Sequence, residues 1–97
     1  MITSPSNERI KAIRALAEPK VRRREGRFVV EGVRLIEAAL EAGARPLQVL
    51  VNPAQLETTE RGRILLARLA AFPTITVSER ALHAAATTEH PQGVLAV

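Results

Sequence analysis

Apolar residues near the start of the chain recur at the spacing of a helix. Ile10, Ile13 and Leu16 lie three residues apart, and charged residues between them would stay solvated. Asn7 precedes this pattern, and asparagine favours the N-cap position of helices. The pattern therefore predicts a first helix of about three turns, which Asn7 caps.

The next segment changes from basic to apolar. Pro19 ends the first helix or begins a new turn, and residues 20–25 can form a short basic helix that Gly26 closes. The run RFVV at residues 27–30 has the apolar character of a buried strand. This order places positive charge beside a strand.

A helical stripe separates this strand from a second one. Residues 32–43 carry Val33, Ile36 and Leu40 on one stripe and end on a glycine in the C-terminal capping position. Residues 46–52, PLQVLVN, then have the character of a second apolar strand.

The second half of the chain repeats this alternation. We expect a helix over residues 57–71 and a third strand at residues 74–77. Ser78 can cap a fourth helix over residues 78–87, and residues 93–97 have the character of a fourth strand. The alternation predicts one α/β domain with a mostly parallel sheet, helices on both faces and right-handed crossovers.

Length and composition limit what the chain can be. Its 97 residues allow one small domain, and the apolar run at the end leads us to expect further sequence in the native protein. The absence of cysteine removes disulfides and thiol chemistry, and the N-terminus lacks the apolar run of a signal peptide or membrane span. We expect a soluble cytoplasmic protein with no membrane partner.

Few side chains are suited to catalysis or metal binding. The chain has no Asp or Tyr, and its only imidazoles are His83, expected on a helix surface, and His90, expected in a loop. The glycines match no nucleotide-binding motif, and the serines suit capping positions. We therefore expect no catalytic residue, no cofactor site and no metal site in these residues.

The positive charge is concentrated in the first third of the chain. Residues 1–34 carry nine Lys or Arg and four Glu, a net +5, whereas residues 35–97 carry five Arg and six Glu, a net −1; together these give +4. The basic run at residues 20–27 precedes a strand end and a helix N-terminus, which indicates an anionic partner such as nucleic acid. A merely solvated basic surface is the alternative interpretation.

Several short motifs, in this order, resemble one known family. They are Ser4-x-x-Asn7, Lys11, the basic run through Arg23, Phe28-x-x-Glu31-Gly32-x-Arg34, Glu37-Ala38 and Pro91-Gln92-Gly93-Val94. Over nearly its whole length the chain resembles the N-terminal substrate-binding domain of SpoU-type (TrmH-like) RNA 2′-O-ribose methyltransferases.

The resemblance implies a three-layer α/β/α domain similar to ribosomal proteins that bind kink-turn RNA. It implies that this domain grips RNA, often large-subunit ribosomal RNA, for a separate catalytic domain expected after residue 97. That catalytic domain would be a knotted, dimeric module that binds S-adenosylmethionine. The chain departs from the family in having no tyrosine near its basic run, which argues against a stacking contact there.

The resemblance also narrows the site residues. The side chains expected to contact RNA phosphates are Lys20, Arg22, Arg23, Arg24, Arg27 and Arg34, with Arg9 and Lys11 extending the track. Gly32 would let the RNA backbone approach the helix N-terminus. Glu31 could accept a hydrogen bond from a ribose 2′-hydroxyl or cap locally, and both roles stay open.

Two other functions compete with this one. The basic face could dock an acidic protein, or the catalytic domain of the same enzyme, as a protein-interaction module. The chain could instead be a free-standing kink-turn RNA-binding protein of the ribosomal type.

Overall fold

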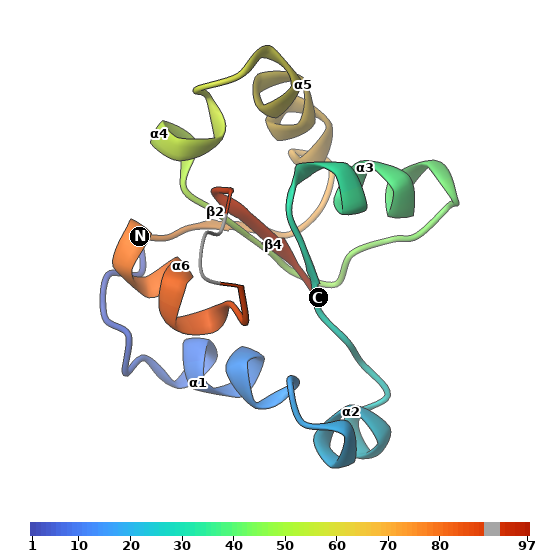
Figure 1. Ribbon diagram of the computed structural model, residues 1–97, viewed down its shortest axis with the longest axis vertical. Coiled ribbons are helices and arrows are strands. Elements are labelled where there is room, and N and C mark those ends of the chain that lie inside the picture. The colour runs from blue at the N-terminus through green and yellow to red at the C-terminus, as the bar shows by residue number, and fades with distance from the viewer. Residues whose placement is uncertain (89–91) are drawn as a thin grey trace.

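The computed structural model describes residues 1–88 and 92–97; His90, predicted to lie in a loop, is outside them. The chain forms helices and short strands in an alternating order (Figure 1). The elements are α1 (Glu8–Ala15), α2 (Pro19–Glu25), β1 (Val30–Glu31), α3 (Val33–Glu41), β2 (Val49–Val51), α4 (Pro53–Leu56), α5 (Glu60–Leu69), β3 (Thr74–Thr76), α6 (Glu79–Ala85) and β4 (Val94–Ala96). None of the helices in these described ranges is long and apolar enough to cross a membrane.

The sheet has the strand order β1-β4-β2-β3 and is mixed. Only β2 and β3 are parallel, whereas β4 runs antiparallel to both β1 and β2, so the prediction of a mostly parallel sheet is wrong in this respect. Asn52 N donates to Gly93 O at 2.9 Å, which places the start of β4 beside the end of β2. A strand that enters the sheet at this end must run in the opposite direction to its neighbour.

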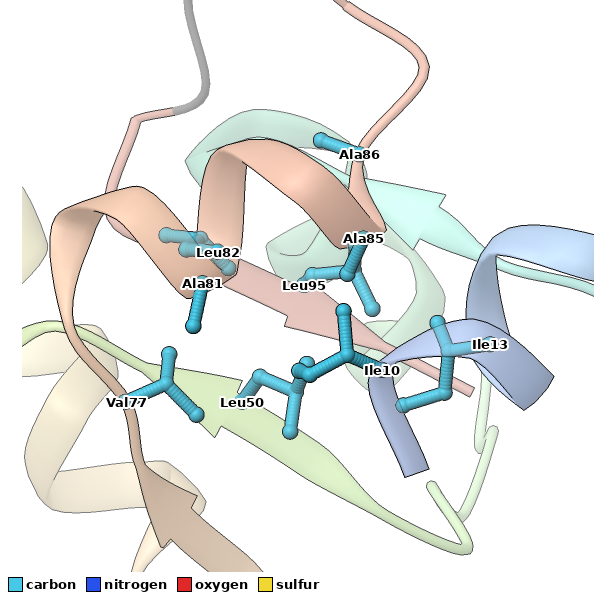
Figure 2. Close-up of a cluster of buried hydrophobic side chains, with 9 residues drawn as sticks. All are labelled: Ile10, Ile13, Leu50, Val77, Ala81, Leu82, Ala85, Ala86 and Leu95. Atoms are coloured by element: carbon cyan, nitrogen blue, oxygen red, sulfur yellow. The ribbon is translucent and has the colours of Figure 1, made fainter. Parts of the chain in front are cut away.

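Helices cover both faces of the sheet. Successive side chains of a strand point to opposite faces, so the central strands bury residues on both sides. Leu50 of β2 and Leu95 of β4 are buried against α1 and α6 (Figure 2). Their strand neighbours Val49, Val51 and Val94 are buried against α3, α4 and α5. The expected three-layer α/β/α domain is thereby confirmed.

Polar side chains fix where several helices begin. Asn7 Oδ1 accepts a hydrogen bond from Arg9 N at 2.8 Å, and Ser78 Oγ accepts one from Ala81 N at 3.0 Å, which confirms both predicted caps. The helix predicted over residues 57–71 is instead α5, which Thr59 caps, preceded by the separate turn of α4. The two pack closely, since a Cβ at Gly62 would lie 1.9 Å from Leu56 O.

The prediction of a buried strand at residues 27–30 is also wrong. Only Val30 of this run pairs in the sheet, opposite Ala96, and Glu31 continues the strand. Phe28 lies before the first paired residue of β1 and is 65% exposed. A short edge strand therefore leaves one of the chain's two aromatic side chains on the surface.

Candidate nucleic-acid interface

Helix α2 presents a basic surface at one end of the molecule. Lys20, Arg23 and Arg24 are exposed on the helix, and Arg27 is exposed just after the left-handed turn at Gly26, where φ is 66°. We call these four side chains the α2 basic surface. None of the α2 residues is buried, so most of this helix is free to contact a partner. Figure 1 shows α2 at the end of the molecule away from α4 and α5.

Arg22 differs from the other cations of α2. Its Nη1 donates to Leu16 O at 3.0 Å and to Ala17 O at 2.8 Å, and the side chain is partly buried. These carbonyl groups lie at the C-terminal end of α1, where a positive charge is favoured. Arg22 therefore fastens α2 to α1, and its predicted phosphate contact stays a prediction.

Phe28 lies beside the α2 basic surface. Its ring helps to line a shallow hollow of about 320 Å³ together with Pro19, Arg22, Arg23, Gly26 and Arg27. The sequence interpretation missed this exposed aromatic because it placed Phe28 in the core. The sequence held one signal, since Phe28 lies only two residues after Gly26, which was expected to close the basic helix.

Glu31 holds the turn that follows α6. Its Oε2 accepts from Thr87 N at 2.9 Å and Thr87 Oγ1 at 2.7 Å, and its Oε1 accepts from Thr88 N at 3.3 Å and Thr88 Oγ1 at 2.9 Å. Burial raises the pKa of Glu31, but hydrogen bonds from Thr87 and Thr88 outweigh burial, so the net pKa is lowered. The structure shows a local role for Glu31, and its RNA contact stays a prediction.

The turn at Gly32 starts α3 with help from a distant side chain. Gly32 has φ 92° and is the N-cap residue, and Val33 N donates to Gln92 Oε1 at 2.9 Å. A Cβ at Gly32 would lie 3.2 Å from that same oxygen. The N-terminus of α3 is thus capped partly by Gln92. The sequence interpretation included Gln92 in the Pro91-Gln92-Gly93-Val94 motif but did not predict this capping role.

A hollow of about 510 Å³ opens beside Arg34, between the start of α3 and the start of α5. We call it the α3–α5 hollow; it is lined by Val33, Arg34, Gln55, Leu56, Thr58, Thr59, Arg61 and Gln92. Arg34 is exposed, and Arg61 Nε is 3.1 Å from Glu37 Oε1, which orients the Arg61 side chain. The sequence interpretation named Arg34 but missed Arg61, because the two come together only through helix packing.

The predicted site residues therefore lie in three places rather than one. The α2 basic surface is at one end, Gly32 and Arg34 lie near α5, and Arg9 and Lys11 are exposed on α1. Figure 1 shows α1 and α2 on the side of the sheet away from α5. A partner that contacts all of these residues must extend over much of the molecule.

His83 is exposed on α6, as predicted.

These features define a small α/β domain whose charged surface suits an extended anionic partner. The MRM3-like substrate binding domain family matches residues 7–96. A crystal structure of an RNA 2′-O ribose methyltransferase is 37% identical with a TM-score of 0.85, covering 98% of this chain and 35% of that chain. The SpoU methyltransferase AviRb from Streptomyces viridochromogenes, solved in complex with AdoMet, is 30% identical with a TM-score of 0.72, covering 93% and 32%.

An rRNA methyltransferase from Sinorhizobium meliloti is 27% identical with a TM-score of 0.70, covering 98% of this chain and 34% of that chain. A search of curated protein sequences gives no significant match. The chain belongs to the family of MRM3-like substrate binding domains, and the resemblance to this domain of SpoU-type RNA methyltransferases is confirmed. It spans about a third of the length of these three structures.

Proposed function

We propose that this domain binds RNA through the α2 basic surface and presents it to a methyltransferase domain of the same protein. The observation that carries the proposal is the exposed cationic helix within a chain whose residues 7–96 match a substrate-binding family. Arginine and lysine side chains of this kind neutralise phosphates without reading sequence. Arg9, Lys11 and Arg34 would extend the contact along α1 and toward α3.

The rest of the enzyme belongs to the same proposal. We place a catalytic domain after residue 97, and with it S-adenosylmethionine, methylation of a ribose 2′-hydroxyl, a homodimer and a cytoplasmic location. The relatives are about three times as long as this chain, and AviRb was solved with AdoMet, which supports this division of labour. We propose large-subunit ribosomal RNA as the substrate; the Sinorhizobium meliloti relative is described as an rRNA methyltransferase.

The α3–α5 hollow does not fit the methyl donor. No carboxylate among the described residues lines it to accept from the ribose hydroxyls or the ammonium group of S-adenosylmethionine. Glu31 lies elsewhere and is already engaged by four hydrogen bonds. We therefore propose that the domain contributes RNA binding and leaves methyl transfer to the catalytic domain.

Fluorescence anisotropy with fragments of large-subunit ribosomal RNA tests the proposal directly. If four phosphates are neutralised, the affinity should fall by roughly two decades between 50 and 200 mM salt. Changing Arg23, Arg24 and Arg27 to Ala should weaken binding and flatten this salt dependence. Arg63, Arg68 and Arg80, which are exposed on α5 and α6, provide a control variant with the same loss of charge.

A protein-docking role makes the opposite prediction in the same assay. Acidic peptides would then compete with RNA fragments as well as unlabelled RNA does, and the salt dependence would not follow the number of arginines removed. Competition by RNA alone would support the RNA-binding proposal.

A further inference from the structure

We propose that Phe28 stacks against an unpaired base of the bound RNA, next to the phosphates that the α2 basic surface contacts. This inference rests on the proposed RNA-binding function and names unpaired RNA as the form that this surface takes. Phe28 is exposed and lines a shallow hollow together with Arg23 and Arg27, two members of the α2 basic surface. The aromatic ring and the two positive charges are therefore available to a single ligand.

The exposure of Phe28 is unusual within this chain. Only two residues are aromatic, and the other, Phe72, packs against a hydrophobic cluster of the core. Exposed cations beside an aromatic ring are the combination with which proteins bind single-stranded nucleic acid. The absence of tyrosine near the basic run argued against stacking, but the exposed ring of Phe28 supplies an aromatic surface at that place.

Both sides of Phe28 are fixed to the fold. On one side, Gly26 N donates to Arg22 O at 2.8 Å, and Arg22 Nη1 donates to two carbonyl groups at the end of α1. On the other side, Val30 pairs with Ala96 in the sheet. The backbone around the ring is thus held in position before RNA arrives, which lowers the entropic cost of binding.

The ring and the cations recognise different parts of a nucleotide. Arg23 and Arg27 can pair with phosphates of any nucleic acid, whereas the ring needs a base face that no neighbouring base covers. In a duplex the bases are stacked on one another, but an unpaired base can be splayed out onto an aromatic side chain. The subsite therefore selects unpaired RNA, with little dependence on which base is present.

A protein contact is the competing explanation for the exposed ring. Phe28 also borders an apolar hollow of about 250 Å³, whose lining includes Leu47 and Val97. Another part of a longer protein could cover the ring from that side. The cations beside the ring favour RNA, since a purely apolar segment would gain nothing from them.

The test compares short oligouridylate with the same oligomer made of abasic (tetrahydrofuran) residues, which carries the same phosphates but no bases. By fluorescence anisotropy we expect the 97-residue wild-type chain to bind oligouridylate about tenfold more tightly than the abasic oligomer, the effect of one base–aromatic stack. Phe28→Leu should abolish this preference and leave the salt dependence unchanged, because it removes no positive charge. Phe28→Tyr should retain the preference, and Arg27→Gln should weaken binding of both oligomers equally.

Fluorescence gives a direct readout of the contact. The chain contains no tryptophan or tyrosine, so Phe28→Trp introduces a single indole at the proposed subsite. Oligouridylate should quench the indole fluorescence of this variant, whereas the abasic oligomer and an RNA duplex should leave it nearly unchanged. Ile64→Trp is the matched control and should not respond to oligouridylate. Ile64 is exposed to a similar extent on α5, at the end of the molecule away from α2 (Figure 1).

Equal binding of the two oligomers by the wild-type chain, or equal quenching of the Phe28→Trp variant by both, would overturn the stacking contact in favour of a protein contact while leaving RNA binding intact. Failure of the wild-type chain to bind either oligomer would overturn the proposed function and the stacking contact together. The wild-type measurement needs no substitution, so an unstable variant would not prevent a decision.

Discussion

Gln92 Oε1 accepts a hydrogen bond from Val33 N across a sequence separation of 59 residues. This contact joins the segment that leads into β4 to the first turn of α3, where helix N–H groups have no partner within the helix. The Gly32 turn and the wall of the α3–α5 hollow therefore depend on the same side chain.

Removing this cap should lower stability without unfolding the domain. We expect Gln92→Ala to reduce the free energy of unfolding by about 1 kcal/mol, the usual cost of losing an N-terminal capping oxygen. Urea denaturation followed by circular dichroism measures this change. Gln92→Glu keeps an acceptor at the positive end of the helix, so its loss of unfolding free energy should be smaller. An equal loss in both variants would show that the hydrogen bond to Val33 N contributes little.

The lowered pKa of Glu31 predicts a specific dependence of stability on pH. Its pKa is lowered in the folded state below its ordinary value of 4.5, so its stabilising contribution is present above that value. The contribution is lost as the pH falls through the lower folded-state pKa. Glu31→Gln should therefore be less stable than the wild type at pH 7, and the difference should vanish in acid.

Urea midpoints measured from pH 7 down to pH 3 follow this convergence. Glu41→Gln is the matched control, since Glu41 is exposed at the end of α3. A difference that stays constant over the whole pH range would mean that the Thr87 and Thr88 hydrogen bonds do not depend on the charge of Glu31.

Arg22 and Arg23 are neighbours in sequence but should respond differently to substitution. Arg22→Ala removes two hydrogen bonds to α1 carbonyl groups and should cost about 1–3 kcal/mol of stability. Arg23→Ala should leave the melting temperature nearly unchanged, as for most exposed residues, and weaken RNA binding. Differential scanning fluorimetry measures the melting temperature and fluorescence anisotropy measures RNA affinity on the same samples. Equal changes of both quantities in the two variants would contradict the different roles of Arg22 and Arg23.

Phe28 provides a direct check of the short β1 strand. Because its side chain is 65% exposed, Phe28→Ser should change the free energy of unfolding by less than about 0.5 kcal/mol. A buried phenylalanine would instead cost roughly 3–5 kcal/mol on truncation. Chemical denaturation distinguishes these values, and Phe72→Ser, at the chain's other aromatic, which packs against the core, should show the larger loss.

The elements of the fold could largely be predicted from local patterns. Asn7, Ser78 and the stripe of Val33 and Ile36 reflect capping and helical periodicity, which act over a few residues. The direction of β4 could not be predicted, because alternation of helices and strands does not specify the end at which a strand enters the sheet. Phe28 was placed in the core for a related reason: apolar character predicts burial only where a partner strand is present.

The site was predictable to a similar extent. The exposed cations of α2 follow from composition and a short helix, whereas the role of Arg22 depends on carbonyl groups at the end of α1. Tertiary packing alone brings Arg34 together with Gln55, Arg61 and Gln92. Contacts between segments this far apart in the chain leave no local signal.

The position of β4 has a consequence for how the domain is made. This strand lies between β1 and β2 in the sheet but is the last of the four to leave the ribosome. Until residues 94–96 emerge, β1 has no hydrogen-bonding neighbour and both hydrophobic clusters lack their contributions from β4. Such late, long-range pairing slows folding, so the centre of the sheet and the β4 contacts of both hydrophobic clusters should form only after residues 94–96 have emerged.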